Sequence, residues 1–138
     1  GIGPCVNRRA RILDEAHADV ALDIHADGGP PGGRGFAILE PVKDRTNRHI
    51  VGASARLGEV VRRELLAMTA MPVSTYDGRN GITKRSDLAG LNLATQPKVL
   101  VECGNMRNAH DARMLTSTHF QRRIAAAFAA AVVAYLRR

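Results

Sequence analysis

Aromatic residues are scarce in this chain, and tryptophan is absent. Phe and Tyr together make up 4% of the 138 residues, so a hydrophobic core has to rest on aliphatic side chains. A base-stacking surface for nucleic acid needs aromatic side chains, and no recognisable DNA- or RNA-binding signature occurs either. The net charge of +7 alone would favour a polyanion. The sequence nevertheless argues against nucleic acid as the partner.

Cysteine is almost as rare, and the common metal motifs are missing. Cys5 and Cys103 are the two cysteines, and their spacing excludes a CxxC zinc knuckle or thioredoxin-type motif. The five histidines include no pair at the i, i+4 spacing of the helical HExxH zinc motif. An even cysteine count permits one disulfide, and it is equally compatible with two reduced thiols.

No apolar run is long enough to cross a membrane. The longest, Ile124 to Leu136, falls short of the roughly 20 residues that a bilayer requires, so it predicts a packed helix. The chain opens with Gly1 and shows neither an initiator Met nor a basic and apolar leader, as a mature or cut end would. Its length allows one domain with a sizeable core.

Alternating helix and strand signals predict an α/β fold. Apolar spacing indicates helices over residues 7–18, from Asp44 or Thr46 to Met68, and over 119–136. In the last helix, one face carries Phe120, Ile124, Phe128 and Val132. Strands are expected at 20–25, 35–39, 72–76 and 98–101, with a Gly/Pro loop at 28–33 and a turn at 77–81. Because the strands are continuously apolar, we expect a mostly parallel or mixed twisted sheet with helices on both faces.

Two of these strands end in residues that can do chemistry. Residues 23–27 read DIHAD and residues 99–105 read VLVECGN, so one strand delivers His25 and the other Glu102 to a sheet edge. An imidazole offers zinc a neutral nitrogen, and a carboxylate accepts a proton from metal-bound water. The pair suggests a zinc hydrolase. Two residues do not make a metal site, however, and either one alone is more often a hydrogen-bonded or salt-bridged structural residue.

The order of motifs resembles a known family over nearly the whole chain. A helix is followed by ADVALDIHAD at 18–27, a Gly-rich loop, GFAIL at 35–39, a long helix and QPKVLVECGNMRN at 96–108. This pattern is similar to the zinc-dependent N-acetylmuramoyl-L-alanine amidases of the amidase-3 type. The ending ECGNMRN is most similar to the mycobacterial, actinobacterial branch.

The resemblance implies roles for the two residues. His25 corresponds to a zinc ligand and Glu102 to the catalytic carboxylate that moves a proton from water to the leaving amine. The implied substrate is peptidoglycan or a muropeptide, cut at the amide between N-acetylmuramic acid and L-alanine. The family is exported, which implies a secreted, periplasmic or wall-associated monomer and favours a Cys5–Cys103 disulfide.

This chain also departs from the family pattern. The family's two other zinc ligands, a His and a Glu, precede the strand that carries His25, and no such segment occurs here. We therefore expect residues 1–138 to be the C-terminal portion of one catalytic domain, with the remaining ligands upstream of Gly1. Otherwise Glu15, His17 or Asp27 would have to serve. Asp23, where the family usually has Ser, is expected to contact the imidazole.

Two alternative functions remain open at this point. A non-catalytic wall-binding domain fits if the missing ligands are absent from the mature protein, and a zinc carboxypeptidase-like peptidase would use a similar metal–carboxylate arrangement. Arg79, Lys84 and Arg85 flank a Gly-containing turn near the expected pocket. They could meet substrate carboxylates, although a solvated turn is the simpler interpretation.

Overall fold

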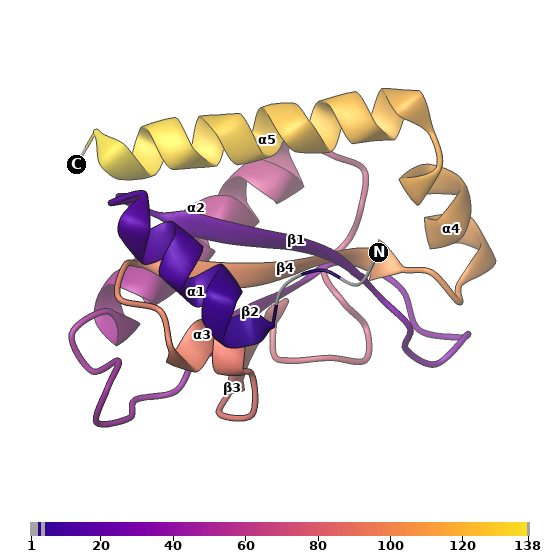
Figure 1. Cartoon of the computed structure of the whole chain (residues 1–138). Coiled ribbons are helices and arrows are strands. Elements are labelled where there is room, and N and C mark those ends of the chain that lie inside the picture. Colours follow the sequence, from indigo (N-terminus) through magenta and orange to yellow (C-terminus); the bar gives the residue numbers. More distant parts are fainter. Residues whose placement is uncertain (1–2, 4, 138) are drawn as a thin grey trace.

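The computed structural model describes residue 3 and residues 5–137, which form a sheet covered by helices (Figure 1). The elements, in chain order, are α1 (Val6–Glu15), β1 (Ala21–Asp27), β2 (Ala37–Pro41), α2 (Val51–Met68), β3 (Ile82–Arg85), α3 (Ala89–Asn92), β4 (Lys98–Asn105), α4 (Ala109–Leu115) and α5 (Thr118–Leu136).

The sheet has four strands in the order β1-β4-β2-β3 and is mixed. β1 runs parallel to β4 and β2 runs parallel to β3, whereas β2 and β4 are antiparallel. Helices α2 and α5 lie on one face of the sheet, and α1 and α3 lie on the other (Figure 1). The predicted α/β class, with a mixed sheet and helices on both faces, is confirmed.

Alternation along β4 divides its side chains between two hydrophobic clusters. Val99, Val101 and Cys103 face α2 and α5 and belong to the larger cluster. Leu100 faces the other way and packs with Leu91 of α3 in the smaller one. Because Glu102 has the same parity as Leu100, it lies on the α1/α3 face. The catalytic candidate is therefore separated from the main core by the sheet itself.

The predicted disulfide is wrong, because the two cysteines occupy different environments. Cys103 is buried in the core against α2 and α5, whereas Cys5 is exposed just before α1 on the opposite face. Burial, reinforced by the charge of Glu102, also raises the pKa of the Cys103 thiol to about 12. At neutral pH the thiol stays protonated, so Cys103 is a packing residue and not a nucleophile.

Several predicted boundaries shift in the structure. The long helix starts at Val51 rather than at Asp44 or Thr46, because the side chain of Asn47 accepts a hydrogen bond from the Asp44 N–H (2.7 Å) and donates one to the Val42 carbonyl (2.9 Å). These bonds hold the preceding residues in turns. Residues 72–76 form one isolated bridge, between Val73 and Phe36, and not the strand we expected.

The last helix packs largely as its apolar face predicts. Phe120 and Phe128 are buried in the main cluster, and Ile124 packs against it, whereas Val132 is half-buried and does not belong to it. Alanines of the same helix, Ala127 and Ala131, are fully buried. Within the described part of the chain, no helix combines the length and the apolar character needed to cross a bilayer.

Candidate active site

His25 and Glu102 lie directly beside each other at one end of the sheet. They are register partners across the parallel pair of β1 and β4, so their backbones are about 4.8 Å apart. The next registered pair is Asp27 with Asn105, and a bulge separates it from the first. His25 is exposed and Glu102 is half-buried, which leaves both side chains open to a ligand at this edge. The sequence prediction that the two motifs converge is consistent with this geometry.

The carboxylate of Glu102 sits in surroundings that favour its protonated form. Burial raises its pKa, and the negative charges of Asp27 and Asp77 raise it further, while His25 and Arg85 lower it. Its Oε2 atom is buried and, within the described residues, lacks a hydrogen-bond partner. An unpaired buried oxygen beside an exposed imidazole is suited to accept a proton from a bound molecule.

A second carboxylate, Asp27, is fixed at the same edge by two donors. Tyr76 donates its hydroxyl to Oδ2 (2.7 Å), and the Gly28 N–H donates to Oδ1 (2.7 Å). Burial and this hydrogen bond to Asp27 raise the pKa of the Tyr76 phenol well above its usual range. The phenol therefore remains a donor under physiological conditions.

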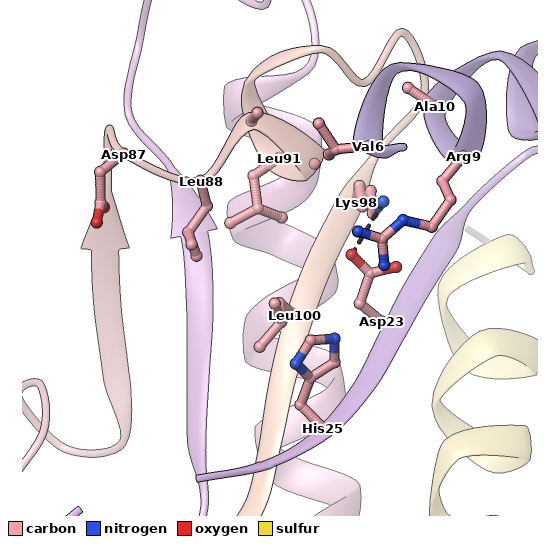
Figure 2. A pocket seen from close by; sticks show the side chains of 12 residues that line it. Val6, Arg9, Ala10, Asp23, His25, Asp87, Leu88, Leu91, Lys98 and Leu100 are labelled. Carbon is pink, nitrogen blue, oxygen red and sulfur yellow. Dashed lines mark ion pairs between the residues drawn. The ribbon is translucent and has the colours of Figure 1, made fainter. Parts of the chain in front are cut away.

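A pocket of about 270 Å³ opens next to His25, between α1, α3 and the sheet. Figure 2 shows Asp23 and His25 along β1, with Arg9 reaching over from α1 and Leu91 on the α3 side. Lys98 lies in the wall, where its Nζ pairs with Asp23 Oδ2 at 3.0 Å and its side chain is only 4% exposed. Asp23 thus has a different partner from the imidazole that we expected.

The three basic residues near the turn, Arg79, Lys84 and Arg85, lie in two different places. Arg85 forms two hydrogen bonds with Asp87, and its charge lowers the pKa of Glu102. Arg79 and Lys84 instead line a shallow hollow beside Glu40. Of the three, Arg85 alone belongs to the candidate site. The four other histidines are exposed: His17, His49, His110 and His119.

The nitrogen and oxygen atoms at this edge are of the types that bind zinc, but they are too few for a complete site. His25 offers an accessible imidazole, and Glu102 offers an unpaired buried oxygen. A hydrolytic zinc site uses about three protein ligands and an open position for water. Among residues 3 and 5–137, no cluster of three His, Cys, Asp or Glu side chains could hold a metal ion. Glu15, His17 and Asp27 therefore do not complete the set within the described residues.

Sequence patterns missed several contributors to this site. Lys98 opens the strand predicted at 98–101, and its alternation with Leu100 places it on the Asp23 face, but no local pattern marks it as the partner of Asp23. Tyr76 adjoins the Asp77-Gly78 turn and comes from a segment without a regular strand. Its contact with Asp27 spans 49 residues and leaves no local pattern in the sequence.

Comparisons with known proteins agree with this architecture. The profile of the Amidase_3 family, N-acetylmuramoyl-L-alanine amidase, matches residues 3–134. A curated N-acetylmuramoyl-L-alanine amidase of Mycobacterium tuberculosis is 37% identical over 135 residues, which is 98% of this chain. The fold and the matched sequence define the class: this chain belongs to the Amidase_3 family.

Solved structures of two mycobacterial relatives superpose closely. The amidase Ami1 of Mycobacterium abscessus is 42% identical with a TM-score of 0.91, over 99% of this chain and 63% of that one. Ami1 of Mycobacterium smegmatis is 39% identical with a TM-score of 0.89, over 99% of this chain and 62% of that one. The chain spans 55% of the length of the Mycobacterium tuberculosis relative.

Proposed function

We propose that this chain forms part of a peptidoglycan hydrolase that cleaves the amide between N-acetylmuramic acid and the L-alanine of the stem peptide. The observation that carries the proposal is the register of His25 with Glu102 on two parallel strands, within a chain of the Amidase_3 family. The cell wall is then its site of action, and a secreted, periplasmic or wall-associated monomer is the form we expect.

In the proposed reaction, Glu102 is the general base. Its unpaired Oε2 accepts a proton from the attacking water and passes it to the departing amine of L-alanine. Because burial and neighbouring acids raise its pKa, the protonated form that must donate is more accessible than for an exposed glutamate. His25 is exposed and Glu102 is half-buried beside it, so a polymer substrate can reach this end of the sheet from solution.

Zinc is the cofactor we propose, with His25 as one of its ligands. When bound, zinc supplies Lewis acidity toward the scissile carbonyl and lowers the pKa of a bound water toward ~7. The described residues do not provide a full ligand set. We therefore propose that residues 1–138 are the C-terminal portion of one catalytic domain and that the other ligands come from outside them.

Product analysis tests the function directly. The complete gene product that contains this chain is incubated with purified peptidoglycan, and the soluble products are identified by mass spectrometry. An amidase releases intact stem peptides and leaves sugar chains with free lactyl groups. Release of terminal amino acids alone would identify a carboxypeptidase-like enzyme. Binding without any release would identify a wall-binding domain, and either result would overturn the proposal.

Metal analysis tests the cofactor separately. The same protein should hold about one zinc ion per molecule, because catalytic sites bind a single ion through a fixed ligand set. The His25→Ala variant should lose most of it. His49→Ala removes an exposed histidine whose ring contacts the Thr95 carbonyl, and it serves as the matched control that retains zinc. Equal zinc content in both variants would exclude His25 as a ligand.

A further inference from the structure

We propose that Tyr76 is a positioning residue: its hydroxyl holds the carboxylate of Asp27 in one orientation beside Glu102, and its ring anchors the loop of residues 28–33 next to the catalytic edge. The inference rests on the proposed amidase function. It adds a residue that the motifs around His25 and Glu102 do not contain.

Both oxygens of Asp27 are already occupied. The Tyr76 hydroxyl donates to Oδ2 and the Gly28 N–H donates to Oδ1, each at 2.7 Å. Two donors on different oxygens leave the carboxylate a single orientation. Without the phenol, Oδ2 would be free to rotate toward the edge where His25 and Glu102 lie, since Asp27 is two residues from His25 on β1. A loose anion there would disturb both the imidazole and the base.

The ring of Tyr76 packs against the loop at two positions where only glycine leaves enough space. At Gly29 and at Gly33, an added Cβ would collide with ring atoms of Tyr76. The Gly/Pro loop therefore packs closely against the ring at both glycines, and its conformation depends on that contact. A loop rich in glycine is otherwise costly to order, because each glycine loses much backbone freedom.

The far side of the loop is held by a fully buried amide. Asn105, which ends β4, donates its Nδ2 to the carbonyls of Pro30 and Gly33, both at 2.8 Å. The buried carboxylate of Asp111 in turn accepts from the N–H groups of Asn105 (3.2 Å) and Gly35 (2.6 Å). The loop is thus held both by the hydrogen bonds of Asn105 and by contact with the Tyr76 ring.

Tyr76 itself is anchored through its backbone. The hydroxyl of Ser74 accepts from the N–H groups of Tyr76 (3.3 Å) and Asp77 (2.9 Å). Ser74 donates its own N–H to the Phe36 carbonyl at 2.7 Å, which ties this segment to the start of β2. A short hydrogen-bonded turn of this kind fixes the ring and hydroxyl before any ligand arrives.

Kinetics of the complete protein test the positioning role, with the second tyrosine as a matched control. Tyr135 donates its hydroxyl to the Ala53 carbonyl at 3.2 Å, on the opposite face of the sheet. Tyr76→Phe should lower kcat at least ~10-fold with KM changed less than about twofold, because misplaced groups slow the chemical step more than binding. Tyr135→Phe should leave both constants unchanged.

A double-mutant cycle shows whether Tyr76 acts through Asp27. In an Asp27→Ala background, Tyr76→Phe should lower kcat little further, because the carboxylate that Tyr76 positions is already absent. The same loss of kcat in both backgrounds, or a Tyr76→Phe enzyme indistinguishable from Tyr135→Phe, would overturn the proposal. A wild-type protein that releases no stem peptide would instead overturn the proposed amidase function on which it rests.

Tyrosine emission provides a readout independent of activity. Residues 1–138 hold no Trp and two Tyr, so Tyr135→Phe leaves Tyr76 as their one emitter, and a comparison of variants that share every other residue of the complete protein isolates its signal. A carboxylate that accepts the phenol proton quenches this emission, so Asp27→Ala in that background should raise it. Asp77→Ala is the matched control, since Asp77 accepts from Thr83 instead (3.0 Å). Equal emission in the two variants would show that the contact does not exist in solution, and would overturn the proposal.

Discussion

Glu40 on β2 is a carboxylate placed almost completely inside the protein. It is 3% exposed, and it packs where Gly58 of α2 leaves room, since an added Cβ there would collide with the carboxylate. Burial raises its pKa to about 7, although Lys84 on the neighbouring strand partly offsets the effect. The folded protein therefore binds a proton at Glu40 more strongly than the unfolded chain does.

This linkage predicts a pH-dependent stability. The contribution of protonated Glu40 is fully present below the unfolded pKa near 4.5 and is lost as pH rises through about 7. Glu40→Gln removes the cost of burying an ionised carboxylate. It should therefore stabilise the protein by about 1–3 kcal/mol at pH 8, where Glu40 is ionised, and change its stability little at pH 4. Denaturant unfolding at both pH values measures this. Glu15→Gln, at an exposed position of α1, is the control, and an equal gain in both variants would refute the assignment.

The positions of His25 and Glu102 could be predicted from the sequence, whereas their roles as zinc ligand and base stay predictions. His25 and Glu102 each close an apolar run, so their place at a sheet edge follows from local sequence. Lys98 and Tyr76 act through partners far along the chain: Lys98 pairs with Asp23, and Tyr76 bonds to Asp27. Such contacts arise only when the sheet brings separate segments together, and no local periodicity encodes them.

At the scale of elements, helix α5 supplies much of the main core. Phe128 is 6% exposed among residues of α2 and the sheet. Phe128→Ala should cost about 3–5 kcal/mol, since it removes a large buried side chain and leaves a cavity. Val133→Ala, at a position 45% exposed on the same helix, should cost less than about 0.5 kcal/mol. Urea unfolding of both variants measures the free energy of unfolding. A loss below about 1 kcal/mol for Phe128→Ala would contradict the packing of this residue in the core.

Long elements could be predicted, and short ones could not. Helices α2 and α5 and strands β1, β2 and β4 each carry an extended apolar pattern. β3 reads ITKR, and three of its four residues are polar, so it shows no strand signal and forms because it pairs with β2. The short helices α3 and α4 likewise depend on their surroundings. In α4 the Asn108 side chain caps the helix by accepting from the N–H groups of His110 and Asp111.

At the scale of the whole molecule, β1 is an edge strand of the sheet, and Ile24 on it is 62% exposed. We expect a strand from outside residues 1–138 to pair beside β1 and to bring the missing zinc ligands, because an open edge and an exposed Ile are unfavourable in water.

The isolated chain should therefore bind zinc poorly. Calorimetric titration of residues 1–138 should detect no tight stoichiometric site, whereas the complete protein should hold about one ion. The isolated chain should also unfold more readily than the complete protein. Tight binding by residues 1–138, together with cleavage of a muramoyl amide, would contradict this expectation and would make Glu15, His17 or Asp27 a ligand.

The Glu102→Gln variant of the complete protein is the sharpest test of whether Glu102 is the base of a muramoyl-amide hydrolase. Glutamine keeps the shape of the side chain but cannot accept the proton of water. Turnover on muropeptides, followed by mass spectrometry, should fall at least ~10²-fold, while zinc content and thermal stability stay as in the wild type. Near-native turnover would exclude Glu102 as the base, and loss of zinc would make Glu102 a ligand instead.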